Sequence, residues 1–342
     1  MNIVGGNSKQ FLGRSNDAST LHTNNHSGVV SYEPTELVVT VRAGTPMQAL
    51  NDLLLSNGQM LPFEPPVLNS GTIGGVLACG LSGPARPFAG AARDYVLGMR
   101  VINGQAQALR FGGEVMKNVA GYDAARLHVG AHGTLGVLLE TSMKVLPLPE
   151  STITVQHELA NAFDVSSLVA LMRQPLPISA AAVIDKALYI RLSGSESAVN
   201  AAAKICGGEL VNNDTQFWTS IREREHAFFV NDQRPLWRIS VPEFTDQLGI
   251  EGEWLYDWAG AMRYLKTDAA ATQIYQAAKA ASGHATCYTP TRMADDVPLF
   301  QPIEGAMQTI QKRVRDSFDE HRLFNPGRFH PELDTHNSTA DH

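Results

Sequence analysis

A glycine-rich stretch over residues 65–98 constrains this chain more than any other feature. Five glycines fall between positions 69 and 83, among small residues. Glycine tolerates positive φ and lets backbone N–H groups approach a ligand with no Cβ in the way. Successive N–H groups of this kind form an anion-binding nest, which is stronger where a helix begins. The stretch predicts a pyrophosphate-binding loop, with a plain turn as the alternative. Two more glycine loops, at residues 4–13 and 130–136, favour the first interpretation.

A strand and a helix are expected just before this stretch. Residues 37–41 are β-branched and apolar, which is typical of a buried strand. Thr45 suits the N-cap of the next helix, Pro46 its first helical position, and Gln48 completes a capping box. Gly58 ends the helix.

A hairpin is expected after the stretch. Residues 95–102 and 105–111 indicate two strands, and Asn103-Gly104 between them is typical of a type I′ turn. Hairpins build antiparallel sheet. The glycine loops also lack the strand–GxGxxG–helix context and the following acidic residue of a dinucleotide-binding unit. Both observations disfavour a nicotinamide cofactor.

Composition excludes several functional classes. The chain has 342 residues and a net charge of -7, with no basic stripe for nucleic acid. Its three cysteines are widely spaced and form no CxxC, so they supply no iron–sulfur or zinc ligand set. No apolar run reaches the roughly 20 residues of a membrane helix, and no signal peptide is visible. We expect a cytoplasmic protein, with peripheral attachment to the inner membrane through a complex as the alternative.

Several segments together resemble one protein family. They are GGNSKQFLGR, GQMLPFEPP, ACGLSGPARP, RFGGEVMKNVAGYD, GTLGVLLETSMKVLPLP and FNPGR, spread over nearly the whole chain. TIGGVLACG and RDYVLGMRVI are similar to a flavin-contacting segment of the FAD-binding domain shared by vanillyl-alcohol oxidases and p-cresol methylhydroxylase. Within that superfamily the chain most resembles the FAD-binding subunits of bacterial glycolate oxidase (glycolate dehydrogenase).

The resemblance implies an α+β fold with several parts. Residues 1–150 would form a two-subdomain FAD-binding domain of the p-cresol methylhydroxylase type, its N-terminal edge lacking a strand and helix that relatives carry. Residues 151–302 would form an α+β cap, with an antiparallel sheet and helices on one face. A helix within 303–330 would lead back to the FAD domain, and 331–342 would be a disordered tail. Cap helices are expected at 165–173, 197–206, 218–229 and 269–281.

The resemblance also implies FAD and its ligands. Some relatives bind the flavin covalently through a His after the first two glycines; Asn7 stands there, so non-covalent FAD is expected. No metal is expected, because Gly130 and Gly133 interrupt any helix that would pair His128 with His132. The residues expected to contact FAD are Gly5, Gly6, Asn7, Ser8, Gly71, Thr72, Gly74, Gly75, Ala78, Gly80, Gly83, Asp94, Gly121, Tyr122, Gly136, Val137 and Asn325.

Catalytic residues are harder to assign. Oxidation of a 2-hydroxy acid by a flavin needs a cation for the carboxylate and a base for the hydroxyl proton. Candidate cations are Arg238, Arg263 and Arg292, and candidate bases are His284 and His132. Arg263 is the most suggestive, because Trp254, Tyr256 and Trp258 nearby could form a flavin-facing wall. For each, a packed or solvated side chain is the alternative.

Three functions remain open at this point. Related catalytic subunits carry a metal motif resembling HxxGDGNxH in the cap, and this chain has none. The favoured function is an FAD-dependent oxidoreductase subunit of a heteromeric glycolate oxidase, with a larger flavin subunit and an iron–sulfur subunit as partners. The alternatives are a self-sufficient dehydrogenase for a 2-hydroxy acid and a non-catalytic assembly subunit with a vestigial flavin site.

Overall fold

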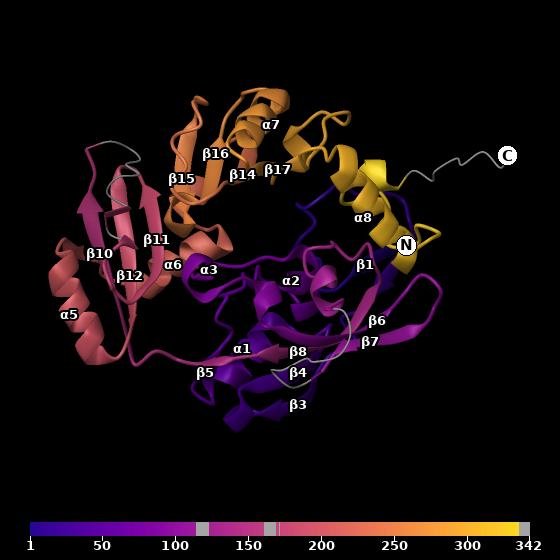
Figure 1. The fold of residues 1–342 in the computed structure, drawn as a ribbon, viewed down its shortest axis with the longest axis horizontal. Helices are drawn as coiled ribbons and strands as arrows, with labels where there is room; N and C mark the ends of the chain where they lie inside the picture. The colour runs from indigo at the N-terminus through magenta and orange to yellow at the C-terminus, as the bar shows by residue number, and fades with distance from the viewer. Residues whose placement is uncertain (114–122, 161–168, 171, 335–342) are drawn as a thin grey trace.

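Two antiparallel sheets organise the protein. The computed structural model describes residues 1–113, 123–160, 169–170 and 172–334. Figure 1 shows one sheet at the bottom, built from the first part of the chain, and the second sheet to its left and above it. The predicted α+β fold with an antiparallel cap sheet is confirmed. No helix in these described ranges is both long and apolar enough to cross a membrane.

The first sheet has five strands in the order β3-β4-β8-β6-β7. Helices α1 (Met47–Leu55) and α2 (Ile73–Cys79) pack on it, because their apolar side chains share one buried cluster with β4, β6 and β8. Two short pairs, parallel β1-β2 and antiparallel β5-β9, lie beside it. The strands are β1 (Asn2–Val4), β2 (Thr20–His22), β3 (Val29–Glu33), β4 (Val38–Arg42), β5 (Gln59–Met60), β6 (Val96–Ile102), β7 (Ala108–Gly112), β8 (Val137–Lys144) and β9 (Leu146–Pro147).

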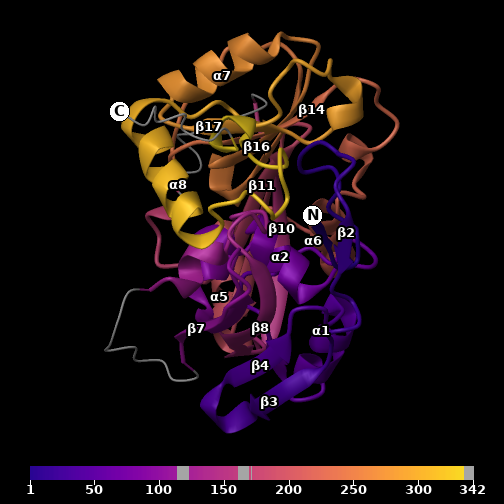
Figure 2. The same cartoon turned by 90° about the vertical axis from the view of Figure 1, so that its right-hand side faces the viewer.

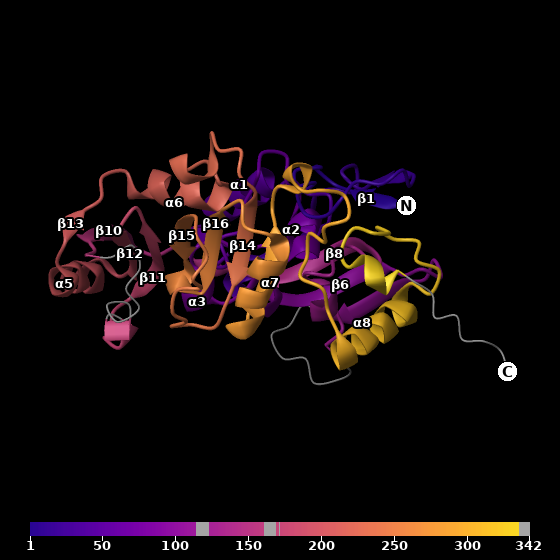
Figure 3. The ribbon, with the colours of Figure 1, turned by 90° about the horizontal axis from the view of Figure 1, so that it is seen from above.

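The second sheet has eight strands in the order β13-β10-β12-β11-β15-β16-β14-β17, all paired antiparallel. Figure 3 shows this sheet and its helices from above. Its strands are β10 (Ser151–Glu158), β11 (Ile178–Ile184), β12 (Ala187–Gly194), β13 (Glu209–Leu210), β14 (Leu236–Ser240), β15 (Glu253–Asp257), β16 (Met262–Lys266) and β17 (His284–Cys287). Its helices are α5 (Glu196–Cys206), α6 (Asp214–Glu223) and α7 (Ala271–Ala280).

The cap helices do not all lie on one face, so that prediction is wrong. Side chains alternate between the faces of a strand. On β11, Val183 packs in the cluster that contains α5, whereas Ala182 and Ile184 pack in the cluster that contains α6. Helix α6 therefore lies on the face that also meets the glycine-rich stretch, through Leu81.

The C-terminal segment returns to the first sheet. Helix α8 (Gly305–Phe318) lies above β7 in Figure 2, and the ring of Phe318 meets Phe111 of β7 edge-on at 6.0 Å. The predicted disorder from residue 331 is wrong for residues 331–334. Pro331–Leu333 forms a 3₁₀ helix, η7, and Asp334 pairs with the buried Arg315. Residues 335–342 lie outside the described ranges.

Two local predictions are wrong because tertiary contacts take over the side chains concerned. The hydroxyl of Thr45 donates to Arg42 O (2.7 Å) and accepts from Gly28 N (3.0 Å), so Pro46 is the N-cap and no capping box forms. The β6–β7 connection spans five residues, and Asn103 Oδ1 accepts from two of its N–H groups. A type I′ turn needs positive φ at both central residues, but here Ala106 has it.

Two of the helices expected in the cap need comment, and the remaining elements are short. The helix expected over 218–229 is α6, which ends at Glu223 because Arg224 adopts a left-handed conformation. The helix expected at 165–173 falls largely on residues outside the described ranges. The remaining elements are η1 (Pro34–Glu36), α3 (Arg86–Ala89), η2 (Ala92–Asp94), η3 (Ala125–His128), η4 (Ala227–Phe229), η5 (Trp258–Gly260) and η6 (Pro290–Arg292).

Candidate functional site

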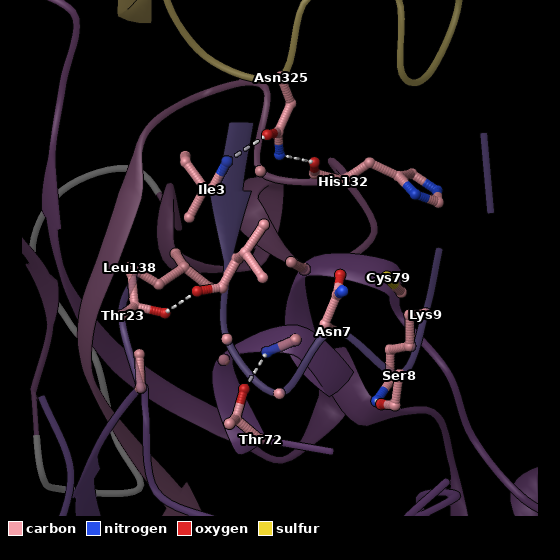
Figure 4. Close-up of a pocket in the computed structure, with 18 of the residues that line it drawn as sticks. Ile3, Asn7, Ser8, Lys9, Thr23, Thr72, Cys79, His132, Leu138 and Asn325 are labelled. Atoms are coloured by element: carbon pink, nitrogen blue, oxygen red, sulfur yellow. Dashed lines mark hydrogen bonds between the residues drawn. The ribbon is translucent and has the colours of Figure 1, made fainter. Parts of the chain in front are cut away.

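Three glycine loops and the C-terminal segment enclose a cavity of about 100 Å³, here called the glycine-loop cavity. Figure 4 shows Asn7, Ser8 and Lys9 on one side of it, Thr23 and Leu138 on the other, and Asn325 above. Most of the residues predicted to contact FAD line this cavity. They are Gly5, Gly6, Asn7, Ser8, Thr72, Gly74, Gly75, Ala78, Gly136 and Asn325.

Close backbone contacts explain why glycine occupies key positions in these loops. A Cβ at Gly6 would lie 1.5 Å from the carbonyl oxygen of Ser70, which no rearrangement of a side chain could relieve. A Cβ at Gly74 would lie 2.7 Å from the carbonyl oxygen of Ala43. The loops can therefore meet only if both residues lack a side chain.

The N-terminus of α2 does not supply the anion-binding groups expected from the sequence. The N–H groups of Ile73, Gly74 and Gly75 already donate to Thr45 O (3.0 Å), Ala43 O (2.8 Å) and Thr72 Oγ1 (3.3 Å). By contrast, the N–H groups of Gly6, Asn7 and Ser8 have no protein partner among the described residues. The N-terminal loop is therefore the part of the cavity that offers free backbone donors.

Two cations complete the cavity, and sequence reasoning missed both. Lys9 is only 6% exposed, and its Nζ contacts Ser8 Oγ at 3.2 Å. Burial lowers the pKa of Lys9, and burial likewise lowers the pKa of Arg328, whose guanidinium donates to Lys9 O at 2.9 Å. Neither side chain forms an ion pair with a carboxylate in the described ranges. Free N–H groups beside two buried cations fit a pyrophosphate, so the residues present fit FAD.

Some predicted FAD ligands lie elsewhere. Gly71, Asp94 and Val137 do not line the glycine-loop cavity, and the carboxylate of Asp94 instead accepts from the N–H of Ala91 at 2.8 Å. Gly80 and Gly83 line two neighbouring cavities. Gly121 and Tyr122 lie outside the described residues.

A second cavity, of about 350 Å³, adjoins the first through Cys79 and His132, which line both. We call it the histidine cavity, because His132, His284 and His330 line it together with Arg238 of β14. The structure thus brings together both predicted bases and one predicted cation. His330 was not predicted, although it follows the FNPGR segment by only one residue.

Electrostatics keep these histidines neutral. Partial desolvation of the ring in the cavity, with smaller effects of Arg238, Arg86 and His330, lowers the pKa of His284 to about 4, although the residue as a whole is exposed to solvent. Burial, with Arg328 and His330, lowers the pKa of His132 to about 3. Burial also lowers the pKa of His330, although Glu332 opposes this. Near pH 7 the imidazoles can accept a proton.

Arg238 is the cation available to a ligand here. Its guanidinium lies 5.3 Å from the ring centroid of Trp258 and has no hydrogen bond or ion pair within the part of the chain that the structure describes. An unpaired cation beside neutral imidazoles can hold a carboxylate while a neighbouring base takes a proton.

The structure contradicts the preference for Arg263. This side chain is fully buried, and its guanidinium donates to the carbonyl oxygens of Gly260 (2.9 Å), Asp246 (2.8 Å) and Thr245. It lines neither cavity. Arg292 is also distant from them; it donates to Arg234 O at 2.7 Å.

The aromatic residues that were expected to form a flavin-facing wall do not all have the same neighbours. Trp254 and Tyr256 stack on each other at 5.8 Å, whereas the indole N–H of Trp258 donates to Gly83 O at 2.9 Å. Trp258 therefore reaches the glycine-rich stretch.

Comparisons with known proteins agree with this geometry. Residues 1–112 match the family described as FAD binding domain. Over 332 residues the chain is 46% identical to glycolate oxidase subunit GlcE of Escherichia coli (strain K12), covering 97% of this chain and 93% of the relative. It is 34% identical over 127 residues to glycolate oxidase subunit GlcD of Bacillus subtilis (strain 168), covering 37% of this chain and 27% of the relative. A solved alkyldihydroxyacetonephosphate synthase matches with a TM-score of 0.64 and 13% identity, over 94% of this chain and 71% of that one.

Proposed function

The chain belongs to the family of glycolate oxidase GlcE subunits, and on that basis we propose that it binds FAD in the glycine-loop cavity and oxidises a small 2-hydroxy acid, glycolate first, in the histidine cavity. It is an FAD-dependent oxidoreductase subunit acting on CH–OH groups. One observation carries the placement of the reaction. Arg238, a cation without an anionic partner among the described residues, faces a cavity that adjoins the FAD loops.

The side chains of the histidine cavity have different roles in the proposed reaction. Arg238 holds the carboxylate of the acid and so fixes the orientation of its hydroxyl group. His284 takes the hydroxyl proton, because its pKa of about 4 leaves the imidazole neutral. His132 is the weaker candidate, since its ring is packed against Phe329 at 4.6 Å and Phe300 at 5.2 Å. FAD, when bound, supplies the acceptor for the hydride, and the product is the 2-oxo acid, glyoxylate in the case of glycolate.

Onward electron transfer needs partner subunits. The three cysteines of the sequence cannot provide the four ligands of an iron–sulfur cluster. We therefore place beside this chain an iron–sulfur subunit and a larger flavin subunit, in a complex that associates peripherally with the inner membrane. The names of its relatives, which are subunits of glycolate oxidase, support a complex of several subunits.

The visible spectrum of the purified chain tests this function. We expect a yellow protein whose flavin bleaches when glycolate is added anaerobically, and whose bleaching rate falls at least tenfold in Arg238→Gln. Arg313→Gln, which removes an exposed charge on α8, is the matched control. A yellow protein that glycolate does not bleach would contradict the catalytic proposal and point to an electron relay or a structural flavin. A colourless protein that FAD cannot reconstitute would contradict the site itself.

A further inference from the structure

A third cavity lies next to the histidine cavity and shares Leu81, Arg238 and Tyr288 with it. We call it the arginine cavity, because Arg222, Arg224 and Arg238 all line it. Its volume is about 30 Å³. A water needs roughly 10–15 Å³ of such space, so the cavity holds about two water-sized groups. The two oxygens of a carboxylate match this size, and a whole hydroxy acid does not.

Arg224 is held in this cavity by unusual local structure. It caps α6 in the left-handed conformation, with a φ of 59°, and its N–H donates to Ile221 O and Ser220 O. Its guanidinium lies 3.7 Å from the ring centroid of Phe11 and 5.4 Å from that of Tyr288. A side chain fixed by its backbone and packed against two neighbouring aromatic rings presents its charge in one place.

The charge of Arg224 is not balanced by the protein. Its side chain forms no hydrogen bond or ion pair within residues 1–113, 123–160 and 172–334. Neighbouring Glu223 is already used, because it accepts from the N–H groups of Val67 and Leu68 and pairs with Arg222. Two other poorly exposed arginines have carboxylate partners: Arg191 pairs with Glu64 at 2.8 Å, and Arg315 pairs with Asp334. A half-buried cation without a carboxylate partner is costly, so an anionic ligand is the natural partner.

The cap sheet places two phenols between the two unpaired cations. Tyr264 is the direct partner of Arg238 across β14 and β16, so both project from the same face. The rings of Tyr264 and Tyr288 meet edge-on at 6.2 Å. Neither hydroxyl has a hydrogen-bond partner in the described residues. The nearby carboxyl group of Asp257 does not offset the positive charge fully, because burial raises its pKa to about 7.

We propose that the arginine cavity is a second anion-binding subsite, in which Arg224 and the two phenols take the distal carboxylate of a 2-hydroxy dicarboxylate. The substrate class of the enzyme then includes four- and five-carbon hydroxy diacids besides glycolate. This proposal rests on the proposed function only in assigning the first carboxylate to Arg238.

Equilibrium binding of two acids that cannot be oxidised tests the subsite. Succinate carries two carboxylates and acetate one, and their Kd values are measured on the flavin-containing chain by perturbation of the flavin spectrum. We expect succinate to bind about tenfold or more tightly than acetate. In Arg224→Gln the ratio of the two Kd values should fall close to one, and in Arg224→Lys part of the preference should remain. Arg313→Gln should keep the full preference.

Two results would overturn the proposal. One is a wild-type chain that binds succinate and acetate equally. The other is an Arg224→Gln protein that keeps the succinate preference while the midpoint potential of its flavin shifts, since the guanidinium would then serve the flavin. Anaerobic bleaching by glycolate is a separate measurement. If glycolate leaves the flavin yellow but the chain still binds succinate more tightly than acetate, the proposed function is contradicted and the subsite is supported.

Discussion

The two sheets of this protein hold ligand-binding groups in different ways. Around the first sheet, the groups are mostly backbone N–H groups on loops that meet too closely for a side chain at Gly6. Around the second, they are side chains, such as Arg238 and His284, that project from the sheet toward the glycine-rich stretch. Loops fixed by backbone contact suit the recognition of one cofactor that is the same in every reaction cycle. Side chains on a sheet face can be exchanged without altering the fold, so we expect substrate choice to be set there.

This division motivates a domain boundary. We propose residues 1–150 as the FAD-binding domain, 151–302 as the cap, and 303–330 as the segment that returns to the first domain. All strands of the five-stranded sheet come from the first range and all strands of the eight-stranded sheet from the second, which supports the proposal.

The largest effect should follow a change in the backbone-built half. In Gly6→Val the new side chain collides with the carbonyl of Ser70, so we expect complete loss of FAD, measured by the ratio of visible to ultraviolet absorbance. Gly58→Val is a suitable control, because a Cβ there meets nothing within 4 Å, although its φ of 65° costs some stability. Retention of FAD by Gly6→Val would falsify the assignment of this loop.

The next effect separates two arginines of the cap. Arg263→Met leaves one buried and two partly buried carbonyl groups without this donor, and we expect a loss of roughly 3 kcal/mol in the free energy of unfolding. Arg238→Met removes no such contact and should leave this free energy nearly unchanged. Denaturant unfolding of both variants measures the difference, and equal losses would show that Arg238 is structural.

A smaller effect is expected for the buried cation of the glycine-loop cavity. Lys9→Met keeps the volume of the side chain but removes its charge, so the Kd for FAD should rise about ten- to hundredfold. Lys204→Met, on the exposed side of α5, is the control. Titration of the apoprotein with FAD gives both constants; an unchanged Kd would mean that Lys9 does not meet the phosphates.

The last effect is spread over several pH units and has opposite signs in the two halves. Folding lowers the pKa of His132 to about 3, so its contribution to stability falls as pH drops from about 6.5 toward 3. Folding raises the pKa of Asp257 to about 7, so stability falls as pH rises from about 4 to 7, by at most about 1.4 kcal/mol per pH unit. In Asp257→Asn this second loss should disappear from the pH profile of unfolding. A parallel profile in the variant would disprove the assignment.

Much of the fold could be read from the sequence, because alternating apolar residues and glycine chemistry act locally. The predictions that were wrong concern residues whose structure is set by contacts with distant parts of the chain. The turn at Asn103-Gly104 is altered because Gly104 N donates to Phe318 O, which comes from α8 and lies 2.7 Å away. Lys9 was overlooked because nothing local shows that it is buried.

The wrong choice of Arg263 has a simple cause. It precedes Tyr264 on β16, so the two side chains point to opposite faces of the sheet. Tyr264 lines the arginine cavity, and Arg263 therefore faces away from it. The pairing of β14 with β16 places Arg238 opposite Tyr264, but one sequence alone does not determine which residues of two strands lie opposite each other.

Asn325 ties together the two ends of the chain. Its N–H donates to Met1 O (2.9 Å), while its side chain accepts from Ile3 N and donates to His132 O, both at 2.7 Å. Contacts between residues so far apart in sequence form late in folding. During synthesis the first domain emerges from the ribosome long before residue 325, so its glycine loops lack these contacts until Asn325 has been made. We therefore expect a chain truncated before Asn325 to remain without flavin.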